Sequence, residues 1–383
     1  MSPISPIRPK GLDVAFVVQG EGRGHMTQAL AVRDVLVDAG HRVVAVYLGT
    51  SPIHPAPEYF AARMEGTEAM TVPVIRFPAP TLVADGRRRG MSATRTAAYN
   101  ARRLPAYVAA GLAMRRSLRA HRPDVVVNFF DLVAGFVHAF TWWPAPPPRV
   151  ALAHAYLMRH PGAGPPPPGA AGRMGLEALS RIAAAGAGAP VALSFDELPD
   201  VPGVRVAPPL LRPGLDRVDP EDGGYLLAYA LNGGYAREVA EWQARNPAVP
   251  VHCYVSGGGE GLGLAPSPGF HLHDLDDEGF LRHLARCRAY AGTAGFESVC
   301  EAFYLGKPVL AVPVDGHYEQ AFNAADIRRA GVARTGTFQD LDRFWADPPV
   351  PPEARVRTFR TWVARAPDIL VRAVEEAART PEP

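Results

Sequence analysis

Short apolar runs alternate along this chain with longer stretches in which apolar residues recur at helical spacing. The first run, Asp13–Gln19, is almost wholly apolar, and a glycine loop and an amphipathic stretch to about Ala39 follow it. Apolar runs without polar alternation predict strands buried on both faces, as in parallel sheets covered by helices. Further strands of this kind are expected at Arg42–Leu48, Val72–Arg76, Val125–Val127 and Arg149–His154. The pattern therefore predicts an α/β fold.

The same alternation starts again after a proline-rich region. Six prolines lie within Pro199–Pro220, which we interpret as the region of an interdomain linker. Beyond it, strands are expected at Tyr225–Ala230, Val251–Val255, Gly269–Leu272, Tyr290–Gly292 and Pro308–Val312. A chain of 383 residues favours two domains, each with its own core. We expect domains over residues 1–207 and 208–350, and a helical tail over 351–383.

One segment resembles a membrane span. Val125–Trp143 is largely apolar over 19 residues, but it contains Asn128, Asp131 and His138. It also divides into a β-branched run and a helical run, so we predict a strand followed by a helix.

Cysteine usage and the first residues indicate a cytoplasmic protein. The three cysteines lack CxxC spacing and have no clustered histidines near them in the sequence, so they are expected to be reduced. They are Cys253, Cys287 and Cys300. The first eleven residues lack the apolar core of a signal peptide.

The net charge of +2 conceals an asymmetry. Residues 1–207 hold 22 basic and 14 acidic residues, whereas residues 208–383 hold 18 and 24. Arg87–Arg122 contains ten arginines and no acidic residue, with apolar residues between them. Such a segment can contact an anionic membrane surface at the inner face, bind a phosphate group of an acceptor, or be a solvated helix. No nucleic-acid motif is present, and the total charge disfavours a nucleic-acid partner.

The most informative stretch is Gly292–Asn323. It predicts a glycine-containing turn, a helix over about Gly295–Leu305, a buried strand and a second helix that begins near Tyr318. The first turn would present unpaired amides at a helix N-terminus, which favours phosphate. Glu297 and Glu301 are four residues apart and therefore share a helix face. A carboxylate beside an anion site suits sugar hydroxyls, so we predict a nucleotide-diphosphate pocket.

This stretch resembles the donor-binding signature of GT-B glycosyltransferases, in the style of the bacterial enzyme that forms lipid II and of the UDP-glycosyltransferases. The resemblance implies two Rossmann-like doubly wound domains facing across a cleft. It also implies that Glu301 holds the ribose, that Glu319 and Gln320 meet the transferred sugar with Asn323, and that four residues surround the diphosphate. These four are Thr293, Ala294, Gly295 and Ser298. Many relatives have His where this chain has Thr293.

The glycine loop Gly20–His25 is the second region of resemblance. A dinucleotide-binding loop would show GxGxxG and an acidic end to the second strand, and neither is present. In GT-B enzymes this loop faces the interdomain cleft, which implies that Gly22 and Gly24 lie near the donor. A helix N-terminus favours neutral His25, which can then act as a general base.

Several other positions follow from these expectations. Asp131, and with less support Asn128, is a candidate to orient His25, or it simply caps a helix. His154 also ends a strand on the ligand side, and no role is assigned to it. By family position, Asn232 and Gly233 approach the diphosphate and Leu272 contacts the base. Ser256–Gly261 is either a phosphate cradle or a plain surface loop.

Together these features predict a metal-independent, inverting glycosyltransferase of the hexosyltransferase type. It would transfer a sugar from a nucleotide-diphosphate donor, with UDP favoured, to a hydroxyl of a small molecule or lipid. No cofactor beyond this co-substrate is expected, because no acidic pair with metal-ligand geometry stands out. Two alternatives are a nucleotide-sugar epimerase on the same fold and a non-catalytic nucleotide-binding partner protein.

Overall fold

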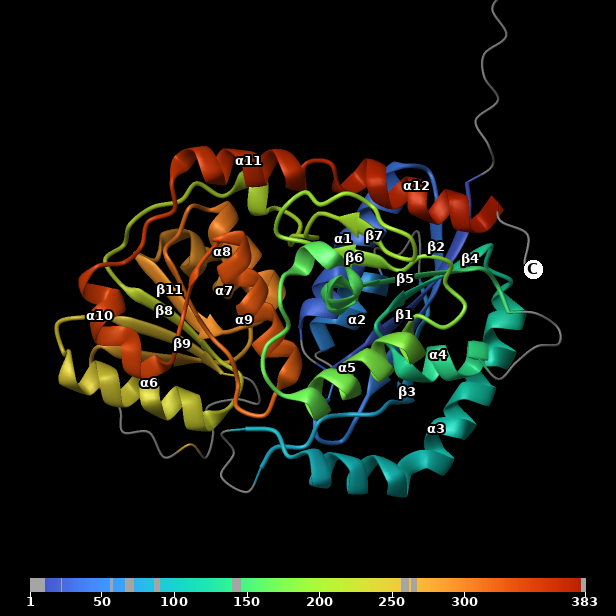
Figure 1. The fold of residues 1–383 in the computed structure, drawn as a ribbon, viewed down its shortest axis with the longest axis horizontal. Helices are drawn as coiled ribbons and strands as arrows, with labels where there is room; N and C mark the ends of the chain where they lie inside the picture. Colours follow the sequence, from blue (N-terminus) through green and yellow to red (C-terminus); the bar gives the residue numbers. More distant parts are fainter. Residues whose placement is uncertain are drawn as a thin grey trace, which may run out of the picture.

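Two parallel sheets, each flanked by helices, divide the chain (Figure 1). The computed structural model describes residues 11–21, 23–55, 58–65, 72–85, 90–139, 146–255, 262 and 267–379. Gly22, the loop Ser256–Gly261 and residues 87–89 of the arginine-rich segment lie outside the described residues. The expected fold class, a pair of Rossmann-like domains, is confirmed.

The first sheet has seven strands in the order β3-β2-β1-β4-β5-β6-β7, all parallel. Its strands are β1 (Asp13–Gln19), β2 (Arg42–Thr50), β3 (Val74–Pro78), β4 (Val125–Phe129), β5 (Arg149–Ala153), β6 (Val191–Leu193) and β7 (Arg205–Ala207). The helices between them are α1 (Gly24–Asp38), α2 (Glu58–Glu65), α3 (Ala93–His121), α4 (Leu132–Ala139) and α5 (Ala170–Ala183), with the 3-10 turns η1 (His154–Arg159) and η2 (Pro161–Ala163).

The second sheet has six parallel strands in the order β10-β9-β8-β11-β12-β13. Its strands are β8 (Leu226–Ala230), β9 (Val251–Val255), β10 (Phe270–His273), β11 (Ala289–Thr293), β12 (Val309–Val312) and β13 (Arg334–Thr335). Its helices are α6 (Gly233–Arg245), α7 (Asp277–Arg286), α8 (Phe296–Tyr304), α9 (Tyr318–Ala330) and α10 (Leu341–Ala346), with the 3-10 turns η3 (Leu215–Arg217) and η4 (Phe338–Asp340).

Two closing helices join the domains along one side (Figure 1). The first, α11 (Glu353–Val363), packs against α8 of the second domain, and the next, α12 (Ala366–Arg379), packs against α1 of the first. The Trp362 indole donates to the Ser194 carbonyl at 3.0 Å, which ties the connection between them to the first domain. Pro367 lies in the first turn of α12, where a missing N–H costs no helical bond.

The central strands are buried because they consist of apolar, mostly β-branched residues. All five residues of β4 are buried, and α4 follows after Asp131, as predicted for the segment resembling a membrane span. Among the described helices, none has the length and apolarity required to cross a membrane. The prolines and glycines of Pro161–Gly172 predict an irregular loop. That prediction is wrong in part, because the segment contains the 3-10 turn η2 and the beginning of α5.

Candidate active site

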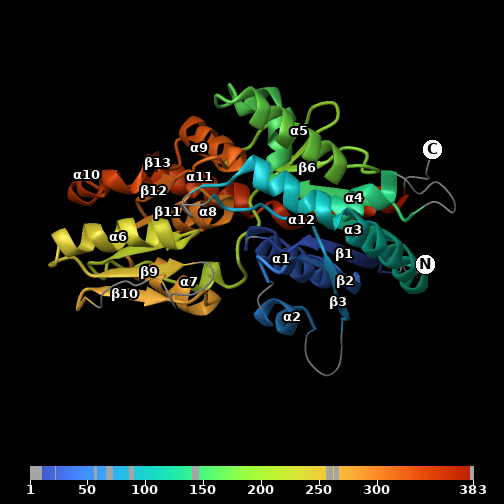
Figure 2. The same ribbon diagram turned by 90° about the horizontal axis from the view of Figure 1, so that it is seen from below.

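The first turns of α1 and α8 meet at the interface between the domains. Seen from below, α8 and α7 of the second domain lie beside α1 of the first (Figure 2). β11 leads through Ala294 and Gly295 into α8, so the buried strand fixes where this helix begins. The approach is close, because a Cβ built on Gly24 would overlap the Glu297 carboxylate. Glycine at position 24 therefore makes room for a side chain of the other domain.

A hydrogen-bonded chain crosses this interface. The Gln28 amide nitrogen donates to Glu297 Oε1, and Gln28 Oε1 lies 3.3 Å from His25 Nδ1. Because the amide nitrogen faces the carboxylate, the amide oxygen faces the ring, and His25 Nδ1 must carry the proton. In the described part of the chain His25 Nε2 has no hydrogen bond, so it is the basic nitrogen. Sequence reasoning missed Gln28, which lies one turn after His25 on the same face.

His25 is neutral at physiological pH. Burial lowers the pKa of His25 to about 4, although the hydrogen bond to Gln28 opposes this shift. Its ring stacks on Phe130 with centroids 5.8 Å apart and planes within 14°. Phe130 has a φ of 59°, a strained conformation for a bulky residue, and such strain often marks functional positions. Phe130 therefore holds the imidazole plane, a role with no clear signal in the sequence.

Asp131 does not orient His25 in this structure. Its Oδ1 accepts a hydrogen bond from the Ala134 amide at 2.8 Å, so it caps α4. Its own amide donates to Asn128 Oδ1, and Asn128 in turn donates to the Ala183 carbonyl. Both side chains are fully buried and shape the β4–α4 connection. The capping alternative is what the geometry shows.

Three partly exposed glutamates gather around this interface. Burial raises the pKa of Glu21, Glu297 and Glu319 to about 7 in each case. Glu319, in the first turn of α9, is near enough to raise the pKa of both other carboxyls by charge repulsion. Glu21 accepts a hydrogen bond from the Leu82 amide at 2.9 Å. Glu21 was not among the residues predicted to form the site, and Glu297 was named on the helix face without a role of its own.

Glu301, the predicted ribose ligand, forms an ion pair with an arginine. It is 0 % exposed, and its two oxygens accept from Arg212 at 3.1 and 3.2 Å. Arg212 also lies 3.5 Å from Asp277, and Asp277 pairs with Arg23 of the first domain at 2.8 Å. Burial raises the pKa of the Glu301 carboxyl, and the Arg212 guanidinium offsets part of that rise. In this conformation no surface of Glu301 is available to a ligand, so its ribose role stays a prediction.

The turn before α8 has the backbone expected of an anion site. Thr293 and Ala294 are buried at the end of β11, while Gly295 and Ser298 are partly exposed. Gly295, the N-cap residue, has no side chain, so the N-cap position contributes no side-chain hydrogen bond to the first amides of α8. The Asn323 side chain of α9 donates to the Ala294 carbonyl at 2.9 Å, which ties the turn to α9.

Other predicted donor residues serve the local structure. Asn232 Oδ1 accepts from the amides of Gly234 and Tyr235 and so caps α6, and Leu262 covers Gly233. Gln320 Oε1 accepts from the Val314 amide and holds the loop before α9. Leu272 lies within the edge strand β10 and packs on the second domain's core. Their contacts with a donor stay predictions.

His154 is a packing residue at the domain interface. It is 3 % exposed, its Nδ1 lies 2.8 Å from the Leu193 carbonyl, and its ring stacks on Phe296 at 4.0 Å. Its Nε2 lies 3.6 Å from Asp326 of α9. These contacts join the domains and leave the ring no access to a ligand.

The structure also forms a cluster that the sequence reasoning did not detect. His252, His273 and His283 each direct a ring nitrogen toward one region, although 31 residues separate the first from the last. The sequence analysis found no clustered histidines beside the cysteines, whereas the fold brings these three histidines together in the second domain. The missed signal was the His271-Leu272-His273 sequence in a strand, where alternate residues share a face.

Comparisons with known proteins agree with this architecture. The family model described as "Glycosyl transferase family 1" matches residues 12–346. The calicheamicin glycosyltransferase CalG4 is similar at 19% identity and a TM-score of 0.57, over 97% of this chain and all of that one. SnogD from Streptomyces nogalater has 17% identity and a TM-score of 0.58, with 96% and 99% covered. UGT89C1 of Arabidopsis thaliana, complexed with quercetin, has 14% identity and a TM-score of 0.61, with 96% and 99% covered.

A search of the curated proteins found no match. The low identities of the solved structures show the fold, and the family model covers most of the chain. The GT-B resemblance is thereby confirmed, although no finding singles out the lipid II enzyme. This chain is a glycosyltransferase and belongs to glycosyl transferase family 1.

Proposed function

We propose that this glycosyltransferase transfers a sugar from a nucleotide-diphosphate donor, with UDP favoured, to an acceptor hydroxyl with inversion. The observation that supports this most is the hydrogen-bonded chain from His25 through Gln28 to Glu297. It places a neutral base, with its Nε2 unengaged among the described residues, beside the N-terminus of the helix that would bind the diphosphate. Similar structures are described as complexes with UDP or a UDP-sugar analogue.

In the proposed reaction His25 Nε2 takes the proton of the acceptor hydroxyl. The acceptor oxygen bonds to the anomeric carbon as the bond from that carbon to the diphosphate oxygen breaks, so one displacement inverts the centre. The amides at the start of α8, where the N-cap residue Gly295 has no side chain, would stabilise the charge of the leaving diphosphate, a role that requires no metal. Glu319, partly exposed at the start of α9, would accept hydrogen bonds from the sugar hydroxyls.

The acceptor is proposed to be a small molecule with an apolar or aromatic part. Phe130 stacks on His25 and is 8 % exposed, so one aromatic ring adjoins the base. Two of the similar plant enzymes are described in complex with quercetin and with pterostilbene. A lipid acceptor is the other option, because α3 exposes an apolar stripe beside its arginines. The stripe consists of Leu104, Val108 and Leu112.

Two measurements test this proposal. A panel of nucleotides and nucleotide sugars should raise the melting temperature selectively for the true donor. With that donor, His25→Ala should lower kcat by roughly 10²–10⁴-fold and leave the nucleotide Kd unchanged. His121→Ala, which removes a histidine from the last turn of α3, serves as the matched control. Unchanged turnover in His25→Ala would contradict the base assignment. Nucleotide binding by the wild type without any turnover would favour a non-catalytic nucleotide-binding protein.

Nucleotide-sugar epimerisation is the second candidate, because the structure gathers more carboxylates than the sequence suggested. Glu21, Glu297 and Glu319 supply groups with a pKa of about 7, which suits proton transfer at a sugar carbon. Incubation of the donor without acceptor separates the two reactions. Exchange of solvent deuterium into the sugar would favour epimerisation, and an unlabelled donor supports transfer. Whether EDTA changes the rate tests metal independence in the same assay.

A further inference from the structure

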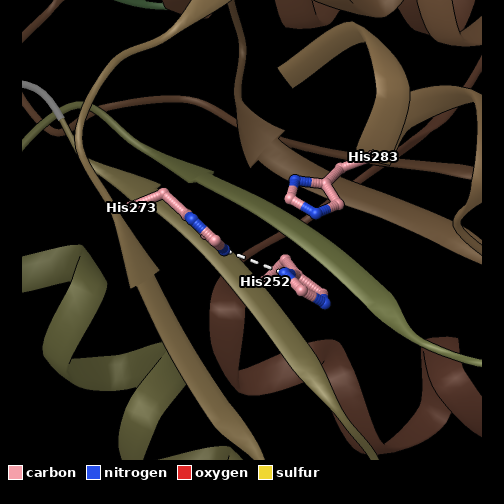
Figure 3. Close-up of side chains that lie close together, drawn as sticks. All are labelled: His252, His273 and His283. Atoms are coloured by element: carbon pink, nitrogen blue, oxygen red, sulfur yellow. Dashed lines mark hydrogen bonds between the residues drawn. The ribbon is translucent and has the colours of Figure 1, made fainter. Parts of the chain in front are cut away.

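Three histidines from separate elements meet on one face of the second sheet. Parallel pairing places His252 of β9 opposite His271 of β10, and Tyr254 opposite His273, so these four side chains share a face. Helix α7 covers that face and contributes His283 from its last turn. Figure 3 shows the rings of His252, His273 and His283 gathered between the two strands and the helix. The fold itself therefore creates the cluster.

The distances are close to those of a metal centre. One ring nitrogen from each histidine lies within 4.8 Å of the other two, and His252 Nδ1 is 2.8 Å from His273 Nε2. In a tetrahedral zinc site with Zn–N distances of about 2.0–2.1 Å, ligand nitrogens are about 3.3 Å apart. The rings now stack, so they must turn to direct their lone pairs to one point. The side chains are partly exposed and the final torsion of histidine is broad, so small ring rotations achieve this.

The protonation and surroundings of the rings also suit a metal. Burial, with further contributions from neighbouring histidines, lowers the pKa of His252 to about 4, and the pKa values of His273 and His283 are lowered as well. Neutral imidazole is the form that ligates metals, so protons do not compete near neutral pH. The Tyr254 hydroxyl lies 2.8 Å from His283 Nδ1, which leaves His283 Nε2 as the ligand atom. A hydrogen bond on the second ring nitrogen is typical of metal-bound histidines.

We propose that His252, His273 and His283 form a binding site for a divalent transition-metal ion, with Zn²⁺ as the probe. Three imidazoles suit Zn²⁺, Cu²⁺ or Ni²⁺, and water would fill the fourth position. The ion would clamp the edge strand β10 and the end of α7 to the sheet. It lies at the opposite end of α7 from Asp277, which pairs with Arg23 of the first domain. The site is therefore structural and separate from the chemistry proposed above.

Calorimetry on the full chain, stripped with EDTA and titrated with ZnCl₂, tests this site. We expect one equivalent of Zn²⁺ to bind and the melting temperature to rise. In His273→Ala and in His283→Gln, Zn²⁺ affinity should fall at least tenfold, consistent with the loss of one ligand. Circular dichroism of the metal-free variants checks that they fold. His273→Ala is expected to disturb the fold less than His283→Gln, because His273 lies on the edge strand β10.

The matched control is His271→Ala, which removes a neighbouring histidine that is not one of the three. It should bind Zn²⁺ like the wild type. Absence of Zn²⁺ binding in the wild-type protein, or equal affinity in wild type and His273→Ala, would overturn the proposal. A loss of binding in His271→Ala would show that these are not the ligands.

Discussion

The first and second turns of α8 have carboxylates four residues apart that differ completely in their surroundings. Glu297, in the first turn, is partly exposed and contacts Gln28 of the other domain. Glu301, in the second turn, is fully buried and bound by Arg212 from the linker. Both lie on one helix face, as their spacing requires. The difference shows that the partner supplied by a distant segment decides whether such a residue is available for chemistry.

The linker therefore closes one part of the predicted donor site. Arg212 links Glu301 to Asp277, and Asp277 pairs with Arg23 at 2.8 Å, so an ion-pair network spans the interface between the domains. The hydrogen-bonded chain from Glu297 through Gln28 to His25 lies one helical turn away from this ion-pair network. For Glu301 to bind ribose, Arg212 must move aside. Four variants examine this contrast, in order of decreasing effect.

Arg212→Met should have the largest effect. It leaves Glu301 buried without its counter-ion, and removal of one partner from a buried pair costs roughly 3–5 kcal/mol of unfolding free energy. Urea denaturation at pH 7 measures this loss. The double variant Arg212→Met, Glu301→Met is the control, and it should recover most of the stability because Glu301 no longer carries a buried charge and Asp277 keeps its pair with Arg23. A single variant as stable as wild type would mean that the pair is not formed in solution.

Glu297→Gln should change how stability depends on pH. Burial raises the pKa of Glu297 to about 7 from an ordinary 4.5, so between these values the folded state keeps a proton that the unfolded state has lost. Wild-type stability therefore falls as pH rises through this window. We expect the wild type to lose roughly 1–2 kcal/mol more than the variant between pH 4.5 and 7, allowing for screening of a partly exposed group. If urea denaturation showed the same change of stability between pH 4.5 and 7 for the wild type and Glu297→Gln, the raised pKa of Glu297 would be contradicted.

Gln28→Leu should lower turnover while keeping the fold. It removes the amide between His25 and Glu297, and one hydrogen bond contributes about 0.5–1.5 kcal/mol, so kcat should fall by up to about tenfold. Steady-state kinetics provide the measurement, and the donor KM should stay constant because Gln28 is not expected to touch the nucleotide. An increase in KM without a change in kcat would assign Gln28 to binding instead of positioning.

Gly24→Ala should have the smallest effect on stability. The added methyl group overlaps only the flexible end of Glu297, which can move away, so unfolding free energy should change by less than about 1 kcal/mol. The displaced carboxylate loses its contact with Gln28, and kcat should fall as in Gln28→Leu. A double-mutant cycle checks this, because additive effects of Gly24→Ala and Gln28→Leu would show that they act through separate contacts.

The fold was predictable because its signals are local. The buried strands β1, β4 and β8 are apolar runs, and glycine loops precede α1 and α8. Errors arose where local pattern is weak. The prolines and glycines around Pro161–Gly172 concealed the start of α5, and β3 is a strand with few buried residues that begins two residues later than expected.

The sequence predicted where the site lies better than it predicted which residues form it. His25 and Glu297 lie in regions that the motifs marked, whereas Gln28, Phe130 and Arg212 have no motif of their own. Asp131 illustrates the reason, because the same residue type suits a helix cap and a catalytic partner. Only the distance between side chains separates these two roles.

The sequence by itself determined two doubly wound domains, the family signature before α8 and the helix start that presents His25. Tertiary structure decided which carboxylate stays accessible, which side chain holds the imidazole, and that His252, His273 and His283 meet. The physical reason is the distance along the sequence over which each property is determined. Strand and helix patterns depend on neighbours within a few residues, whereas burial, charge pairing and ligand geometry depend on segments that the fold brings together from far apart in the chain.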